Sequence, residues 1–267
     1  MFPWQTNNIF FIIIMFCGAK VVHISEKSKK ILYFALFAVP LQPQMRKEMN
    51  FKAALFDLDG VVFDTEPQYT VFWGQQCREF HPEHPGLEQE IKGQTLVQIY
   101  DAWFSGPLEP QQALITERLN RFEQQMSYDY IEGFVSYIMS LREKGVKTAV
   151  VTSSNQPKMQ AVYQARPEFR TLFDAILTSE DFERSKPDPD CYLKAAARLG
   201  VSKEDSVVFE DSFNGLKSGR AAGMYVVGLA TTNAAEKIAP LCDQVIKDYT
   251  LFNLQKDYGR IFSIRQP

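Results

Sequence analysis

The sequence predicts an α/β fold, in which helices cover both faces of an open parallel sheet and a helical subdomain is inserted into the chain. Two observations support this prediction. From Phe51 onward, short apolar runs alternate with turn residues and helical patterns, which is typical of buried parallel strands joined by right-handed crossovers. The stretch from Thr65 to about Ile131 breaks this alternation, because it is rich in Gln, Glu and aromatic residues and contains no convincing strand.

Six short apolar runs are the predicted strands, because each has the length of a strand that is buried on both faces. In chain order they are Ala53–Phe56, Thr148–Val151, Ala175–Leu177, Val207–Phe209, Tyr225–Gly228 and Gln244–Ile246. Glycines mark the predicted ends of three helices, since glycine readily adopts the left-handed conformation that closes a helix. These helices carry Phe134, Ile138 and Leu141 before Gly145, Asp190–Leu199 before Gly200, and Ser212–Ala222 before Gly223.

The composition of the 267 residues is that of an ordinary globular protein, with 45% hydrophobic and 23% charged residues. A net charge of -3 leaves no basic excess that would hold nucleic acid by phosphate neutralisation. We therefore expect a small-molecule partner and no nucleic acid. The sequence does not specify an oligomeric state.

The four cysteines lie far apart and include no Cys-x-x-Cys pair, so they predict neither a zinc knuckle nor a disulfide framework. A reducing compartment, and hence a cytoplasmic location, is expected. His81 and His84 have a spacing that would suit a metal, but no third ligand stands nearby in the sequence, and we expect a solvated loop there.

Residues 1–49 differ from the rest of the chain. Ile9–Phe16 is apolar without a break, but it is shorter than the roughly 20 residues of a membrane-spanning helix. Met45 and Met49 stand just ahead of the first predicted strand, so we expect the working protein to begin at one of them, with residues 1–49 outside the fold and no membrane partner. The alternative is a membrane anchor or export signal. The run has the length of the apolar region of a signal peptide, but the flank before it, Met1 to Asn8, lacks Lys and Arg.

Polar side chains follow several of the predicted strands at the point where each strand ends. In an open parallel sheet, ligands bind in the crevice beyond the carboxyl ends of the strands, so we expect these side chains to meet there. They comprise four carboxylates, three hydroxyls and one ammonium group: Asp57, Asp59, Glu210, Asp211, Thr152, Ser153, Ser154 and Lys186.

The acidic residues of this set point to a metal. Asp57 and Asp59 are two residues apart, so their side chains share one face of the chain if the strand persists. Two carboxylates about 4 Å apart repel by about 4 kcal/mol at an effective dielectric of about 20. A hard divalent cation removes this conflict, and Mg²⁺ suits carboxylates combined with a substrate phosphate. We predict a magnesium site at Asp57, Asp59, Glu210 and Asp211.

The remaining groups point to phosphate. Thr152 and the amide of Ser153, near a predicted helix start, are suited to binding phosphate oxygens, and Lys186 can neutralise further charge. Phosphate monoester hydrolysis is among the slowest uncatalysed reactions, which favours a route through a covalent intermediate. We predict that Asp57 attacks phosphorus, that Asp59 protonates the leaving alkoxide and then activates water, and that Lys186 assists catalysis.

Four motifs resemble those of the haloacid dehalogenase superfamily, in its subgroup of β-phosphoglucomutase-like phosphatases. Taken singly, each motif can be a turn or a helix cap, but together they follow successive strands in the order of a catalytic set. The resemblance covers roughly Phe51 to Leu251. The motifs are FDLDGVVFDTE (Phe56 to Glu66), VVTSSN (Val150 to Asn155), SKPDPDCY (Ser185 to Tyr192) and VVFEDSFNGLKSGRAAGM (Val207 to Met224).

The resemblance implies a Rossmann-like three-layer core with a parallel sheet and an inserted helical cap. It also implies Mg²⁺ held by Asp57, the backbone carbonyl of Asp59 and Asp211, with Glu210 contributing as in mutase-like members. Dehalogenating members lack the second aspartate of the first motif, so Asp59 indicates phosphoryl chemistry. The expected division is a core of residues 50–65 and 132–254, a cap of residues 66–131 and a tail of residues 255–267.

Within the cap, Lys92, Gly93, Gln94 and Thr95 resemble the loop that faces the active site, and they are candidate substrate contacts. Weaker candidates are Arg118 and Arg121. β-Phosphoglucomutases have a histidine and an arginine where this chain has Tyr69 and Leu96, which argues against mutase activity.

The expected function is a Mg²⁺-dependent phosphatase that acts on a small phosphorylated metabolite, most simply a sugar phosphate, through an aspartyl phosphate. A β-phosphoglucomutase-type mutase is the alternative. Two further classes are less favoured. One is a signalling receiver, which uses similar groups but is compact and carries its phosphate acceptor on a later strand, whereas here the acceptor follows the first strand and a long cap comes after it. The other is a phosphometabolite-binding protein without catalysis, which would not need every catalytic position to be filled, as it is here.

Overall fold

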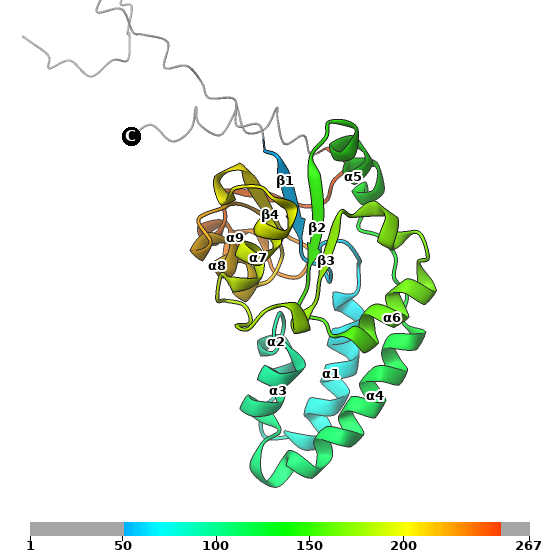
Figure 1. Cartoon of the computed structure of the whole chain (residues 1–267). Coiled ribbons are helices and arrows are strands. Elements are labelled where there is room, and N and C mark those ends of the chain that lie inside the picture. The colour runs from blue at the N-terminus through cyan, green and yellow to red at the C-terminus, as the bar shows by residue number, and fades with distance from the viewer. Residues whose placement is uncertain (1–50, 252–267) are drawn as a thin grey trace, which may run out of the picture. The chain divides into compact units, whose positions relative to one another are not determined.

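A computed structural model of the chain describes residues 51–251 (Figure 1). The predicted extension, residues 1–49, and the predicted tail, residues 255–267, lie outside the described residues, as does the predicted start at Met45 or Met49. Among residues 51–251, no helix is long and apolar enough to cross a bilayer.

Within the described residues, six parallel strands form one sheet in the order β3-β2-β1-β4-β5-β6. The strands are β1 (Ala53–Phe56), β2 (Lys147–Val151), β3 (Ala175–Leu177), β4 (Ser206–Glu210), β5 (Tyr225–Leu229) and β6 (Gln244–Ile246). All six were predicted from the apolar runs. β2, β4 and β5 are one or two residues longer than their apolar runs, because the hydrogen-bonded pairing with neighbouring strands continues through residues such as Ser206 and Glu210.

The order of the strands brings three sequence motifs together. The chain builds outward from β1 through β2 to β3, and then returns to the other side of β1 as β4. Phe56 therefore pairs with Val150 on one side and with Phe209 on the other. The carboxyl ends of β1, β2 and β4 lie side by side at the point where the strand order reverses, which is where open α/β sheets bind ligands.

Helices cover both faces of the sheet (Figure 1). Ala54 and Phe56 pack into an apolar cluster with residues of α5 and α6, whereas Ala53 and Leu55 pack into a second cluster with residues of α7, α8 and α9. The alternation follows from the two-residue period of a strand. These helices are α5 (Phe134–Glu143), α6 (Gln156–Ala165), α7 (Asp190–Leu199), α8 (Phe213–Ala221) and α9 (Ala235–Ile238).

The predicted glycine stop of α7 is confirmed, since Gly200 has the left-handed φ of 68° that closes the helix at Leu199. At the start of α8, the side chain of Ser212 accepts a hydrogen bond from the amide of Gly215, which makes Ser212 the N-cap. Short 3₁₀ turns complete the connections: η1 (Gly106–Gln111), η2 (Phe169–Leu172), η3 (Ser179–Asp181), η4 (Lys203–Asp205) and η5 (Ala239–Leu241).

The segment between β1 and α5 is helical, as predicted. It contains α1 (Glu66–Phe80), α2 (Leu87–Glu90), α3 (Leu96–Trp103) and α4 (Gln112–Gln125). These helices enclose an apolar cluster of their own, which includes Phe72, Trp73, Phe104 and Ile115 and is separate from the two clusters of the sheet. We call this helical segment the cap, and its assigned limits at residues 66–131 stay a prediction.

Candidate active site

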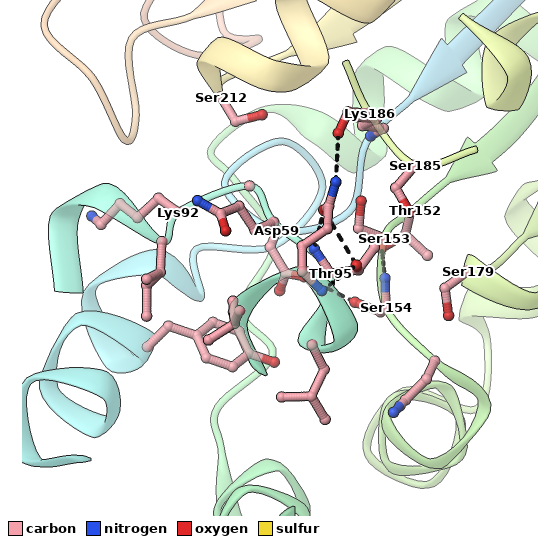
Figure 2. A pocket seen from close by; sticks show the side chains of 18 of the residues that line it. Asp59, Lys92, Thr95, Thr152, Ser153, Ser154, Ser179, Ser185, Lys186 and Ser212 are labelled. Atoms are coloured by element: carbon pink, nitrogen blue, oxygen red, sulfur yellow. Dashed lines mark hydrogen bonds between the residues drawn. The ribbon is translucent and has the colours of Figure 1, made fainter. Parts of the chain in front are cut away.

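A pocket of about 680 Å³ lies at the carboxyl ends of the central strands, with the cap forming its other wall (Figure 2). The described residues that line it include Asp57, Asp59, Thr152, Ser153, Lys186 and Asp211 from the core, together with Lys92, Gly93, Gln94 and Thr95 from the cap. Among the residues predicted to bind metal or phosphate or to act in catalysis, Glu210 is the one that does not line the pocket, because it is completely buried. The structure therefore brings the predicted core residues and the predicted cap loop together around one pocket.

Lys186 is the buried centre of the site, with a side chain that is 2% exposed. Its Nζ donates to Asp57 Oδ1 at 2.5 Å, to Glu210 Oε1 at 2.7 Å and to the carbonyl oxygen of Val151 at 3.0 Å. Burial opposes the ammonium form, but Asp57 and Glu210 outweigh it and hold the pKa of Lys186 above its usual value. Lys186 therefore stays charged next to Asp57.

Glu210, at the end of β4, is completely buried. Its Oε1 accepts hydrogen bonds from Lys186 and, at 2.8 Å, from the hydroxyl of Tyr192, while its Oε2 accepts from the amides of Asp211 and Ser212. A side-chain carbon at Gly215 would overlap this carboxylate, so only glycine fits there. Glu210 thus holds Lys186 in place and fixes the start of α8.

Asp211 follows Glu210 and lines the pocket. Its Oδ2 accepts a hydrogen bond from Thr232 Oγ1, and its carbonyl accepts one from Asn233 Nδ2 at 3.0 Å. The turn after β1 brings Gly60, with a φ of 73°, so close that a side chain at that position would collide with the carboxylate of Asp211. Glycine in the first motif therefore permits the approach of the β1 and β4 loops.

Three carboxylates converge closely enough to hold one cation. Asp57, Glu210 and Asp211 each offer an oxygen within 4.8 Å of the others. Burial, together with the neighbouring carboxylates and against the effect of Lys186, raises the pKa of Asp57 to about 7. Burial also raises the pKa of Asp211 well above its usual value, and Glu66, Glu210 and Asp57 add to this effect. An excess of buried negative charge with oxygen donors fits a hard divalent cation such as Mg²⁺.

Asp59 lies beside Asp57 but is held by other partners. Thr65 Oγ1 donates to its Oδ1 at 2.5 Å, and Ser154 Oγ donates to its Oδ2 at 3.3 Å. The ammonium group of Lys158 also pairs with Oδ2. Lys158 was not among the predicted site residues. A signal was present, because Lys158 falls in the first turn of α6, where the helix dipole disfavours a cation.

The VVTSSN motif forms the end of β2 and the entry to α6. Asn155 caps α6 by accepting a hydrogen bond from the amide of Lys158 at 3.2 Å. Thr152 Oγ1 accepts from the amide of Ser154 at 3.0 Å, which leaves its hydroxyl hydrogen available to a ligand. Thr152, Ser153 and Ser154 lie together on the same wall of the pocket (Figure 2).

The cap loop meets the core at Lys186. Thr95 caps α3 by accepting a hydrogen bond from the amide of Gln98, whose Oε1 in turn accepts from the amide of Thr95. The same Gln98 side chain donates to the carbonyl of Lys186 at 3.2 Å, a contact that Figure 2 draws as a dashed line. Gly93, with a φ of 73°, packs against the side chain of Ser212.

Lys92 pairs with Glu66, the last residue of the first motif, since its Nζ lies 3.6 Å from Glu66 Oε2. Burial and the charge of Asp59 raise the pKa of Glu66 to about 7, with Lys92 opposing this effect. No role was predicted for Glu66, and the structure places it in the pocket lining next to the cap loop.

The weaker candidates, Arg118 and Arg121, do not line the pocket, although both lie in the described part of the chain. Arg118 pairs with Glu79, and Arg121 pairs with Glu117 on the same helix. Their assignment as substrate contacts is not supported, because helix α4 directs them to surface acids.

Within residues 51–251, His81 and His84 belong to no group of three potential metal ligands. The ring of His81 contacts Glu83 and the carbonyl of Trp103, and the ring of His84 contacts Glu90.

Residues 54–229 match the model of one family, which is described as haloacid dehalogenase-like hydrolase. The chain belongs to this family. The match runs from β1 to β5 and so includes all four motifs and the cap. The predicted family, its subgroup and its α/β fold with an inserted cap are confirmed for this hydrolase.

Its relatives include phosphatases and a mutase. This hydrolase is 30% identical over 185 residues to hexitol phosphatase A of Escherichia coli, covering 68% of this chain and 84% of the relative. It is 27% identical over 204 residues to validoxylamine A 7'-phosphate phosphatase of Streptomyces hygroscopicus, covering 75% and 95%. It is also 27% identical to β-phosphoglucomutase of Bacillus subtilis, covering 67% and 83%.

Solved structures share the fold. A haloacid dehalogenase-family hydrolase from Entamoeba histolytica superposes with a TM-score of 0.68 at 22% identity, covering 79% of this chain and 99% of that one. A β-phosphoglucomutase from Clostridium difficile superposes with a TM-score of 0.66 at 17% identity, covering 80% and 98%.

Proposed function

We propose that this hydrolase is a Mg²⁺-dependent phosphatase that cleaves a small phosphomonoester, in particular a sugar or polyol phosphate, through an aspartyl phosphate on Asp57. The observation that carries the proposal is the position of Asp57, which lies in the pocket 2.5 Å from the buried ammonium of Lys186 and within reach of Asp211. The phosphatases among its relatives support the substrate class.

Asp57 would attack phosphorus in line, and the bond from phosphorus to the leaving oxygen would break. Asp59 would give its proton to that oxygen and then take one from the water that attacks the aspartyl phosphate, which regenerates Asp57. Lys186, Thr152 and the amide of Ser153 would hold the transferring phosphoryl oxygens.

The metal would be held by Asp57, the carbonyl of Asp59 and Asp211, with Glu210 behind them. When bound, Mg²⁺ would neutralise part of the charge of the phosphoryl group and of these acids. Glu210 already accepts hydrogen bonds at both of its oxygens, which suits the role of a positioning group better than that of a direct ligand.

The identity of residue 69, a tyrosine, favours hydrolysis over mutase chemistry. This residue stands where β-phosphoglucomutases have a histidine, and its hydroxyl donates to Glu123 at 2.8 Å. Burial and the charge of Glu123 raise the pKa of Tyr69 well above its usual value, so it is not a ready proton carrier.

A test is release of inorganic phosphate from p-nitrophenyl phosphate and from a panel of sugar, polyol and glycolate phosphates, with β-glucose 1-phosphate isomerisation measured in parallel. We expect Mg²⁺-dependent release that EDTA abolishes. Asp57→Asn should lower the turnover rate by at least about 10³-fold, because it removes the attacking charge. Asp101→Asn, at an exposed position of α3, is the control and should leave the turnover rate unchanged. Unchanged turnover in Asp57→Asn would refute the proposal.

We further propose a cytoplasmic location. The cysteines among the described residues, Cys77, Cys191 and Cys242, are buried free thiols, which suits a reducing compartment.

A further inference from the structure

Lys158 connects the proposed acid/base to the cap. It lies on α6 of the core, its side chain is 3% exposed, and its ammonium pairs with Oδ2 of Asp59. The same ammonium lies 4.5 Å from the centre of the Tyr69 ring on α1. Tyr69 in turn donates its hydroxyl to Glu123 Oε1 on α4 at 2.8 Å. One buried cation therefore contacts a core carboxylate and a cap ring at the same time.

The position of Lys158 is energetically demanding. A lysine in the first turn of a helix faces the positive end of the helix dipole, and burial removes its hydration. Such a residue is stable only where fixed partners replace water. Asp59 supplies the opposite charge, and Tyr69 supplies the face of an aromatic ring. Asp59 belongs to the loop after β1 and Tyr69 belongs to α1, so the placement of the ammonium depends on tertiary structure rather than on α6 alone.

The ion pair between Lys158 and Asp59 also limits how the carboxylate of Asp59 can move. Thr65 holds one carboxylate oxygen, and Lys158 with Ser154 holds the other. Removing Lys158 would leave Oδ2 with the longer contact from Ser154, at 3.3 Å. An acid/base must lie within hydrogen-bond reach of the oxygen that it serves, so loss of this orientation is expected to slow proton transfer.

We propose that Lys158 is a positioning residue for Asp59, and that Tyr69 and Glu123 of the cap hold Lys158 in the place where it does this. This inference rests on the proposed phosphatase function. Orientation of the acid/base is then linked to the cap lying against the core, because the network spans α1, α4 and α6.

The role of Lys158 in orienting Asp59 can be tested by comparing substrates with different leaving groups. Expulsion of an alkoxide needs a proton from Asp59, whereas p-nitrophenolate leaves with little help. The ratio kcat/KM reports the steps up to phosphoryl transfer and release of the alcohol. A defect in the orientation of Asp59 is therefore expected to lower kcat/KM for alkyl phosphates more than for aryl phosphates.

The experiment compares kcat/KM of Lys158→Met for the best alkyl phosphate substrate and for p-nitrophenyl phosphate, with Mg²⁺ at saturation. We expect a loss of about 10²-fold for the alkyl ester and less than about 5-fold for the aryl ester, within the range of acid/base contributions. Lys158→Arg should recover part of the alkyl rate, since it retains the charge. Gln160→Met, which adds the same side chain at an exposed position of α6, is the matched control and should match wild type.

Thermal unfolding identifies the folded variants. If Lys158→Met does not fold, Tyr69→Phe is measured in its place, because this change keeps the ring and removes only the hydroxyl that contacts Glu123. For Tyr69→Phe we expect kcat/KM to fall by about 5-fold for the alkyl phosphate and to stay unchanged for the aryl phosphate. Equal losses on both esters, or no loss, in a folded variant would overturn the positioning role. Absence of turnover in the wild type on every ester would instead refute the proposed function, which separates the two failures.

Discussion

Substitution of Lys186 by Met in the metal-free protein should destabilise the fold more than the loss of any surface ion pair. The ammonium contacts Asp57 Oδ1 at 2.5 Å and Glu210 Oε1 at 2.7 Å, and the lysine side chain is 2% exposed. Methionine has a similar volume and flexibility, so packing is largely retained. The change therefore isolates the charge, and it leaves two buried carboxylates next to each other without a counter-ion.

The magnitude follows from these distances. At an effective dielectric of about 20, each contact corresponds to roughly 6 kcal/mol of gross Coulomb attraction. Most of this offsets the cost of burying the charges, so we expect a net loss of about 3–5 kcal/mol of unfolding free energy, the range for removing one partner of a buried pair.

The assay is urea unfolding at pH 8 in EDTA, followed by circular dichroism. The transition midpoint should fall by at least about 1 M, given the usual slopes. Adding Glu210→Gln to Lys186→Met should recover part of the loss, because only one buried carboxylate then lacks a partner.

The matched control is Lys194→Met, which removes the half-exposed pair with Asp190 on α7. It should change stability by less than about 1 kcal/mol. A Lys186→Met variant as stable as this control would refute the view that Lys186 neutralises the buried carboxylates.

Two further predictions concern the metal and the cap. In EDTA, the melting temperature should fall as the pH rises from about 4 to about 7. Burial and neighbouring carboxylates raise the pKa of Asp57 and of Glu66 to about 7, so the folded chain retains protons that the unfolded chain has lost. Mg²⁺ should reverse this fall, and a melting temperature in EDTA that stays constant over this range would contradict the assignment. Gly93→Ala should raise KM or lower turnover on sugar phosphates by about 10-fold without unfolding the core, because its new carbon would meet the side chain of Ser212 at 2.6 Å and displace the cap loop by a fraction of an ångström. Wild-type kinetics in this variant would argue against close contact between the cap loop and the core.

The sheet and the acidic site were predictable because their signals are local. Each buried strand is a short apolar run, and helix α7 ends at Leu199 because Gly200 can adopt a left-handed conformation. The carboxylates stand at strand ends, and parallel strands place all their carboxyl ends at one edge of the sheet. The convergence of Asp57, Thr152 and Asp211 therefore follows from the order of the motifs once the fold is parallel.

The roles of several side chains could not be predicted in this way. Glu210 was predicted as a metal ligand, but the tertiary structure surrounds it with donors from α7, from the turn before α8 and from the Lys186 loop. The contact between Gln98 of the cap and the carbonyl of Lys186 also depends on how the cap lies against the core.

The sequence by itself determined the strands, their order of motifs and the set of acids at their ends, because these depend on hydrophobic period, turn residues and spacing along the chain. Tertiary structure alone decided which residue partners Asp59. Lys158 lies 99 residues from Asp59 along the chain, and the two meet only when α6 packs beside β1 and the cap encloses them. A contact of that kind depends on the packing of whole helices, which no local pattern encodes.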